Sequence, residues 1–312
     1  MKIASLVLCV SFFFVASAKA QHAFITQGNN RLVEINKDGE VCWEVEWGGI
    51  HDIHLLDSGN VMVQRGSHEI VEIDRTTKEV VWQYDSSKQN NPDGIRVEVH
   101  AFQPLADGSV MIAESGLGRI IEVNRDGEIK KTIPLKLDSP DAHRDTRLVR
   151  KLSNDNYLVC HEGDGAVREY SSDGECVWEF NIPLFGMEPK NGHGPESFGN
   201  QVFGAVRLPD GDTLIATGNG HSVLKVDPDQ EIVWSLKQNE LPGITLAWVT
   251  TLEVLSNGNY VIGNCHAGPG NPILIEMNPA TKDVVWQFDG YEQLGNNVSN
   301  SILLDQNESR IR

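Results

Sequence analysis

Basic residues are scarce in this 312-residue chain. Lysine and arginine together number 26 against 44 aspartates and glutamates, which gives a formal net charge of −18 at pH 7. So acidic a chain is a poor match for a phosphate backbone, and we expect no nucleic-acid partner. Cysteine is scarce as well. None of the five cysteines lies in a C-x-x-C or C-x-x-C-H pattern, which argues against a zinc ribbon and a c-type haem site.

Long apolar runs are absent except near the N-terminus. The run from Ile3 to Val15 is shorter than the roughly 20 residues that a spanning helix needs, so we predict no membrane span. Lys2 precedes this run and Ala18-Lys19-Ala20 follows it, an order typical of a secretory signal peptide. We therefore expect residues 1–20 to be a signal peptide and the rest to be soluble and exported, either to the periplasm or outside the cell.

Two sequence markers recur along the remaining chain, and each predicts a tight turn or a strand. The first marker is a polar turn before a new strand, at Asp57–Asn60, Ala106–Ser109, Ser153–Asn156, Pro209–Asp212, Ser256–Asn259 and, in degenerate form, Asp305–Glu308. The second marker is a strand reading G/K-E-x-V-W, which supplies Trp43, Trp82, Trp178, Trp234 and Trp286, with Lys131 in the equivalent place once. We expect these tryptophans to pack between neighbouring units.

The markers divide the chain into units of four strands, named a to d. In the first complete unit these strands are residues 50–56, 60–64, 69–74 and 79–85. Residues 23–47 supply only b, c and d, and residues 299–304 supply a lone strand a. Pairing that last strand with the N-terminal three would close a ring and leave no free sheet edge. The sequence therefore predicts an all-β fold, a six-bladed β-propeller of four-stranded blades, as one domain over residues 21–312.

The repeated "GEVVW" strand resembles the pyrroloquinoline-quinone-like (PQQ-like) repeat of quinoprotein-type propellers, over most of residues 23–290. This resemblance implies the propeller architecture. Quinone-dependent dehydrogenases of that superfamily have eight blades and a vicinal Cys-Cys pair, whereas this chain has the length for six blades and no such pair. We therefore predict that the protein holds no PQQ.

Histidine gathers on one face of the predicted propeller. Because strands alternate in direction, the d-to-a and b-to-c connections share a face, called the top face here, to which eight of the ten histidines map. Counting back eight residues from the third residue of each turn marker gives one position on every strand a. These six positions, called the channel ring, are His51, His100, Arg147, Phe203, Thr250 and Ser299. Strand a is innermost, so the channel ring should surround the channel mouth.

Polar and aromatic residues near the channel ring extend the candidate site. They are Asp52, His143, Arg144, Asn200, Trp248, His266 and Asn300. Histidine and arginine on successive blades suit an anionic group, so we predict a binding site for a small anionic ligand or a partner protein. Structural roles remain open: His51 and His100 could bond backbone carbonyls, His54 could be packed, and Arg147 could pair with Asp145 or Glu98. The oligomeric state remains open.

Metal binding is a rival use of these side chains. The segment "HEGDGA" at residues 161–166 could offer His161, Glu162 and Asp164, but a tight Gly-Asp-Gly turn needs no ion. We therefore predict no metal site. The metal content stays open, because propellers can gather metal ligands from separate blades, which local spacing does not reveal. The four cysteines outside the signal peptide fall on different blades or at opposite blade ends, so we expect them to be reduced.

Two functions fit these features. The first is a non-catalytic binding module that uses the top face. The second is an enzyme, because "HDIHLLDSGNVMV" resembles the "HD-x-x-x-L-P-N-G-N" strand of arylsulfotransferases, six-bladed propellers that transfer a sulfuryl group through a channel histidine. "VSNSILLD" is similar to that family's "H-x-N-S-I" segment, with Val298 in place of its histidine. The resemblance implies His51 as a channel histidine and Asn300 as a polar ligand.

The catalytic roles of such an enzyme can be assigned only in part. His100 is our choice for the nucleophile, and Arg147 would stabilise charge on the sulfuryl oxygens. A third possibility is a lactonase-like propeller with a central cation. That class would line the channel with Glu, Asn and Asp, where this sequence places mainly His and Arg.

Overall fold

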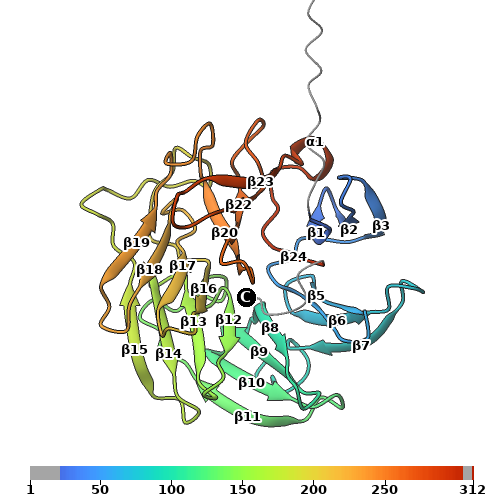
Figure 1. The fold of residues 1–312 in the computed structure, drawn as a ribbon. Coiled ribbons are helices and arrows are strands. Elements are labelled where there is room, and N and C mark those ends of the chain that lie inside the picture. Colours follow the sequence, from blue (N-terminus) through green and yellow to red (C-terminus); the bar gives the residue numbers. More distant parts are fainter. Residues whose placement is uncertain (1–21, 305–310) are drawn as a thin grey trace, which may run out of the picture.

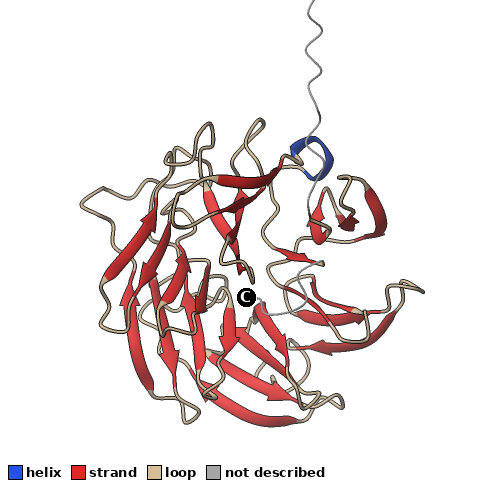
Figure 2. Cartoon of the chain, viewed as in Figure 1, coloured by secondary structure: helices blue, strands red, loops and turns tan. Residues whose placement is uncertain are grey.

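The computed structural model describes residues 22–304 and 311–312, which form six four-stranded antiparallel sheets around a central axis (Figure 1). The prediction of an all-β, six-bladed propeller is confirmed. Strands make up nearly all of its regular structure, and α1 (Tyr291–Leu294) is a single short helix before the last strand (Figure 2). The expected signal peptide and the turn at 305–308 lie outside the described residues.

The strands follow the predicted a-to-d order in every blade. The first blade is β24 (Ser301–Leu303), β1 (Phe24–Gly28), β2 (Arg31–Ile35) and β3 (Val41–Glu46). The second is β4 (Ile53–Leu55), β5 (Val61–Arg65), β6 (Glu69–Ile73) and β7 (Val80–Asp85). The third is β8 (Glu98–Pro104), β9 (Val110–Ser115), β10 (Arg119–Val123) and β11 (Ile129–Pro134).

The other three blades repeat this order. The fourth is β12 (Val149–Lys151), β13 (Tyr157–His161), β14 (Ala166–Tyr170) and β15 (Cys176–Asn181). The fifth is β16 (Gly204–Arg207), β17 (Thr213–Ala216), β18 (Val223–Val226) and β19 (Ile232–Leu236). The sixth is β20 (Trp248–Val254), β21 (Tyr260–Cys265), β22 (Leu274–Met277) and β23 (Val284–Phe288). The a strands lie nearest the axis and the d strands farthest from it (Figure 1).

The a-to-b turns explain the first sequence marker. The third residue of each of the five described turns has a positive φ, from 64° at Asp155 to 95° at Gly211. Glycine adopts this left-handed conformation without strain, and aspartate is among the few other residues that tolerate it. The marker thus records a backbone requirement of the turn.

Neighbouring blades are joined by a repeated contact near the end of strand c. In five of the six blades, the second-to-last residue of strand c is a glutamate that forms an ion pair with the following blade. The pairs are Glu34–Arg75, Glu72–Arg125, Glu122–Lys151, Glu169–Arg207 and Glu276–His22. The fifth blade has Lys225 there, which pairs with Asp210 and Asp212 of its own blade. The strand-c glutamate therefore links five of the six blades to the blade that follows.

The marker tryptophans strengthen the same junctions. Four of them donate the indole Nε1–H to a backbone carbonyl of the next blade, at 2.8–3.3 Å: Trp43 to Arg75, Trp82 to Arg125, Trp178 to Pro228 and Trp234 to Pro279. An arginine or lysine side chain also lies over the rings of Trp82, Trp178 and Trp234. This confirms the expected packing between blades.

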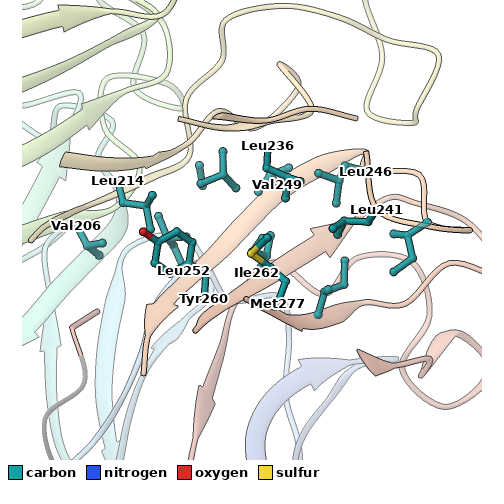
Figure 3. Packing of buried hydrophobic residues seen from close by; sticks show 14 of the residues in the cluster. Val206, Leu214, Leu236, Leu241, Leu246, Val249, Leu252, Tyr260, Ile262 and Met277 are labelled. Carbon is teal, nitrogen blue, oxygen red and sulfur yellow. The ribbon is translucent and has the colours of Figure 1, made fainter. Parts of the chain in front are cut away.

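The hydrophobic core lies between the blades. In Figure 3, Leu214, Val249, Leu252, Ile262 and Met277 interlock where the fifth and sixth blades meet. Burial of each such side chain contributes roughly 1.5–3 kcal/mol. The four cysteines among residues 22–304 are unpaired, as expected, with Cys160 and Cys265 buried and Cys42 and Cys176 exposed.

The first blade closes the ring with strands from both ends of the chain. Strand β1 pairs antiparallel with β24, and Ile25 lies opposite Ile302. Thr26 adds a hydrogen bond from Oγ1 to the Asn300 carbonyl at 2.7 Å. Within the described residues, no helix is both long and apolar enough to cross a membrane.

Substitution of Ile302 should open this closure. Ile302 is 3% exposed and packs with Ile25 and Ile53, so Ile302→Ala should lower the free energy of unfolding by about 2–5 kcal/mol in urea titrations. The control is Val233→Ala on β19, where the side chain is 53% exposed and the expected change is within about 0.5 kcal/mol. Equal effects of the two substitutions would show that the closure adds no stability.

Candidate functional site

A cavity of about 350 Å³ lies on the axis at the top face. Five of the six channel-ring residues line it: His51, Arg147, Phe203, Thr250 and Ser299. The sixth, His100, lies directly behind His51, with the two ring centroids 4.6 Å apart. The counting rule therefore located one site, although the roles of its residues stay predictions.

His51 is held by two amide side chains. Its backbone N–H and its Nδ1 lie 3.1 and 3.3 Å from Oε1 of Gln64, and Nδ2 of Asn300 donates to its carbonyl at 2.8 Å. Because an amide oxygen only accepts, Nδ1 of His51 carries the proton and Nε2 keeps its lone pair. Burial, followed by the charges of His100 and Arg147, lowers the pKa of His51 well below 6.5. His51 is therefore a neutral imidazole with a free basic nitrogen.

Arg147 is held by side chains around it. Its Nε forms a close ion pair with Glu162, Nη1 donates to the His143 carbonyl at 2.6 Å and lies 2.9 Å from Nδ1 of His100, and Nη2 lies 3.3 Å from Nε2 of His143. The acidic partner of Arg147 is therefore Glu162, not Asp145 or Glu98, the two partners that the sequence had left open. The Asp145 carboxylate instead accepts backbone N–H groups of Gly116 and Asp141, at 2.7 and 2.6 Å.

His100 and His143 converge on Glu98. Oε2 of Glu98 lies 2.8 Å from Nδ1 of His143 and 3.3 Å from Nε2 of His100. Nδ1 of His100 lies 3.0 Å from the Thr146 carbonyl. Burial lowers the pKa of His100 to about 4, although Glu98 opposes this effect. The hydrogen bond from His100 is the main cause that holds the pKa of Glu98 far below its usual range.

An aromatic group lines the cavity from the sixth blade and the loop at 182–203. The His193 ring lies 4.9 Å from Trp248, tilted by 32°, and 5.0 Å from His266. Burial and then His193 lower the pKa of His266 to about 4. His193, which our residue selection missed, lies in the longest top-face connection, and that length was the available signal.

Arg144 is the cavity residue with the most freely placed cationic group. Its side chain is 44% exposed, and Nε and Nη2 contact Asp141 at 3.4 and 3.1 Å. Nη1 has no hydrogen-bond partner among the described residues. Glu162, Gln201 and Cys265 complete the polar part of the lining.

Besides His100, three predicted site residues do not line the cavity. Asp52 is fully buried below it, where Arg150 contacts both carboxylate oxygens at 2.7 and 3.0 Å. Burial alone would raise the pKa of Asp52, but Arg150 and His54 reverse this and hold it well below the usual range. Asn300 supports His51 from behind. Asn200 packs against Gly165, where a side chain would collide with its amide.

The "HEGDGA" segment has separate partners for each candidate ligand. Nδ1 and Nε2 of His161 lie 2.8 and 3.0 Å from the Asp145 carbonyl and the Tyr170 hydroxyl. Glu162 pairs with Arg147, and Asp164 pairs with Arg168 at 2.6 Å. The three side chains therefore serve as structural partners rather than as a shared ligand set.

His161 should make stability depend on pH. Burial lowers its folded-state pKa to about 4, against about 6.5 in an unfolded chain. Between these values the unfolded state binds a proton that the folded state does not, so stability falls as pH drops from about 6.5 to 4, by up to about 1.4 kcal/mol per pH unit. His161→Gln should make the pH dependence of the unfolding free energy shallower by about that amount, measured by urea titration from pH 7 to 5. Identical slopes in both proteins would contradict this assignment.

Comparison with known proteins places the chain in a family. The family model described as outer membrane protein assembly factor BamB matches residues 28–288. No curated protein matches the chain. A crystal structure of a protein of unknown function from Bacteroides caccae has a TM-score of 0.74 and 22% identity, covering 91% of this chain and 99% of its own.

Two lyases share the fold more distantly. A streptogramin B lyase structure has a TM-score of 0.56 and 12% identity, with 88% of this chain and 85% of the lyase covered. An inactive virginiamycin B lyase from Staphylococcus aureus, solved with quinupristin, has a TM-score of 0.57 and 13% identity, with 95% of each chain covered. At these identities the likeness concerns the fold alone. By the match over residues 28–288 and its six blades, the chain belongs to the PQQ-like repeat propellers of the BamB-like family.

Proposed function

We propose that this protein is an exported binding module that takes a small planar organic anion into the top-face cavity. The main support for this proposal is that the aromatic rings of Trp248 and His193 and the guanidinium of Arg144 line the same cavity. An aromatic surface favours a flat ring, and a guanidinium favours a carboxylate or sulfate. A volume of about 350 Å³ suits one substituted ring.

The charges of the cavity support an anion rather than a cation. Arg147 and Glu162 neutralise each other, whereas Arg144 retains a free Nη1. The chain as a whole carries a net charge of −18, so attraction of an anion has to come from local groups. Arg144 therefore would supply the charge, and Trp248 and His193 the contact surface. One distant structural neighbour, the virginiamycin B lyase, was solved with a small molecule, which shows that a similar fold can hold one.

Calorimetry with a matched pair of probes tests this proposal. We expect 4-nitrobenzoate to bind at least tenfold more tightly than neutral 4-nitrobenzamide, because only the carboxylate can pair with Arg144. Arg144→Gln and Trp248→Ala should each weaken 4-nitrobenzoate binding about tenfold, equivalent to about 1.4 kcal/mol. Arg125→Gln, on the opposite face over Trp82, is the control and should bind normally. Equal affinity for both probes, or full affinity in Trp248→Ala, would refute the proposal.

A second candidate is transfer of a sulfuryl group. The nucleophile we now propose is His51 in place of His100, because both ring nitrogens of His100 lie within 3.3 Å of protein groups. Gln64 leaves the Nε2 lone pair of His51 available as a nucleophile. That nitrogen would form an N–S bond while the aryl S–O bond breaks and the aryl oxide leaves. The oxygen of an acceptor phenol would then bond to sulfur, the N–S bond would break, and the phenolic proton would pass to the medium.

Turnover of 4-nitrophenyl sulfate with phenol as the acceptor separates the two candidates. A transferase should release 4-nitrophenolate, and His51→Asn should reduce the rate at least about a hundredfold by removing the nucleophile. His68→Ala is the control, because His68 pairs with Asp85 outside the cavity. Absence of turnover by the wild-type protein would eliminate the enzyme and leave the binding module.

A further inference from the structure

We propose that Glu98, His100 and His143 form a binding site for a divalent transition metal at the edge of the top-face cavity. Each of the three side chains offers one ligand atom, and these atoms all lie within 4.8 Å of one another. Oε2 of Glu98 lies 3.3 Å from Nε2 of His100 and 2.8 Å from Nδ1 of His143. Two histidines and one glutamate are a ligand set that proteins use for Zn²⁺ while leaving a coordination position open. This inference does not depend on the proposed anion binding.

Local backbone structure brings the three ligands together. Strand β8 has an irregular register with β9 between Val99 and Ala101, so His100 has no partner residue in the ladder. A bulge of this kind redirects a side chain, and bulges are common beside functional sites. His143 comes from the connection between the third and fourth blades, where its backbone N–H donates to the Asp141 carboxylate at 2.9 Å. The bulge of β8 and the loop that carries His143 therefore bring the ligands to one place.

The surroundings of His100 suit a metal ligand. Nδ1 of His100 lies 3.0 Å from the Thr146 carbonyl, which can accept its proton. Without an ion, Nε2 of His100 donates to Oε2 of Glu98 at 3.3 Å, and Nδ1 can accept from Nη1 of Arg147. When an ion takes the place of the Nε2 proton, Nδ1 can carry the remaining proton and donate it to the Thr146 carbonyl, which leaves the Nε2 lone pair for the metal. The two atoms that share a proton in the metal-free protein are therefore the two that would bind the ion.

Arg147 is the group that opposes a cation here. Its Nη1 lies 2.9 Å from Nδ1 of His100, and its Nη2 lies 3.3 Å from Nε2 of His143. Glu162 balances its charge, and the His143 carbonyl accepts from Nη1 at 2.6 Å, so Arg147 keeps partners when both imidazoles bind a metal. Arg96 also pairs with Glu98, through Oε1, and leaves Oε2 for the ion.

The ion would lie where it can reach the cavity. His143 lines the cavity, and the ring of His51 lies 4.6 Å from that of His100. The other imidazole pair of the cavity, His193 and His266, forms no such group with a carboxylate among the described residues. We therefore place the metal only at the side of the cavity formed by Glu98, His100 and His143.

Zinc titration of the chelator-stripped protein tests this site, with no organic anion present. We expect one Zn²⁺ per chain by calorimetry and by elemental analysis after gel filtration. His143→Ala and Glu98→Gln should each weaken Zn²⁺ binding at least tenfold, because each removes a ligand. His143 is half exposed on a loop, so its substitution should leave the fold intact, which thermal melting will verify.

His68→Ala is the matched control for the titration. His68 is a top-face imidazole 3.0 Å from a carboxylate oxygen of Asp85, but it lies outside the cluster. It should bind Zn²⁺ like the wild-type protein. No binding by the wild-type protein, or full affinity in His143→Ala, would overturn the proposal, whatever the outcome of the 4-nitrobenzoate experiments.

Discussion

Closure of the ring is the constraint on which the rest of this structure depends. Strands from the two ends of the chain share one sheet, and ion pairs of strand-c glutamates and hydrogen bonds of strand-d tryptophans, such as those of Glu72 and Trp82, link neighbouring blades. Each blade alone would expose its apolar faces, so the core exists only between blades. The closed ring of six blades brings six a strands to one axis. The candidate site is therefore a consequence of closure, because its residues come from separate blades.

The repeat made the fold predictable from the sequence. A turn that needs a positive φ and a strand that carries an indole recur at regular intervals along the chain. Counting these intervals predicted the number of blades and the strand that closes the ring. The same register located the channel ring, since equivalent positions in a propeller lie at equal height. Five of these positions line one cavity although hundreds of residues can separate them, as with His51 and Ser299.

What lay outside the repeat could not be predicted. The pairing of Arg147 with Glu162 depends on how a top-face loop folds back, and Asp145 was much nearer to Arg147 in sequence. The bulge at His100 interrupts the regular ladder and turns its side chain toward Glu98, for which alternation of residues gave no signal. Asp52 adjoins His51 in the chain but points into the core, where Arg150 neutralises it. Residues adjacent in sequence, such as His51 and Asp52, therefore have different surroundings where the alternation of a strand places their side chains on opposite faces of the sheet.

The charge state of the histidines bears on both proposed uses of the site, binding of an anion and binding of a metal ion. Burial lowers the pKa values of His100 and His266 to about 4, so these imidazoles do not act as cations near pH 7. A histidine-rich cavity is thus not by itself a positive one, and the positive charge that attracts an anion has to come from arginine or from a bound metal. Neutral imidazoles are, however, the form that coordinates metal ions. Burial therefore makes these histidines poor receptors for an anion but leaves them suited to bind a metal cation. The nearby positive charge of Arg147 is already balanced by Glu162.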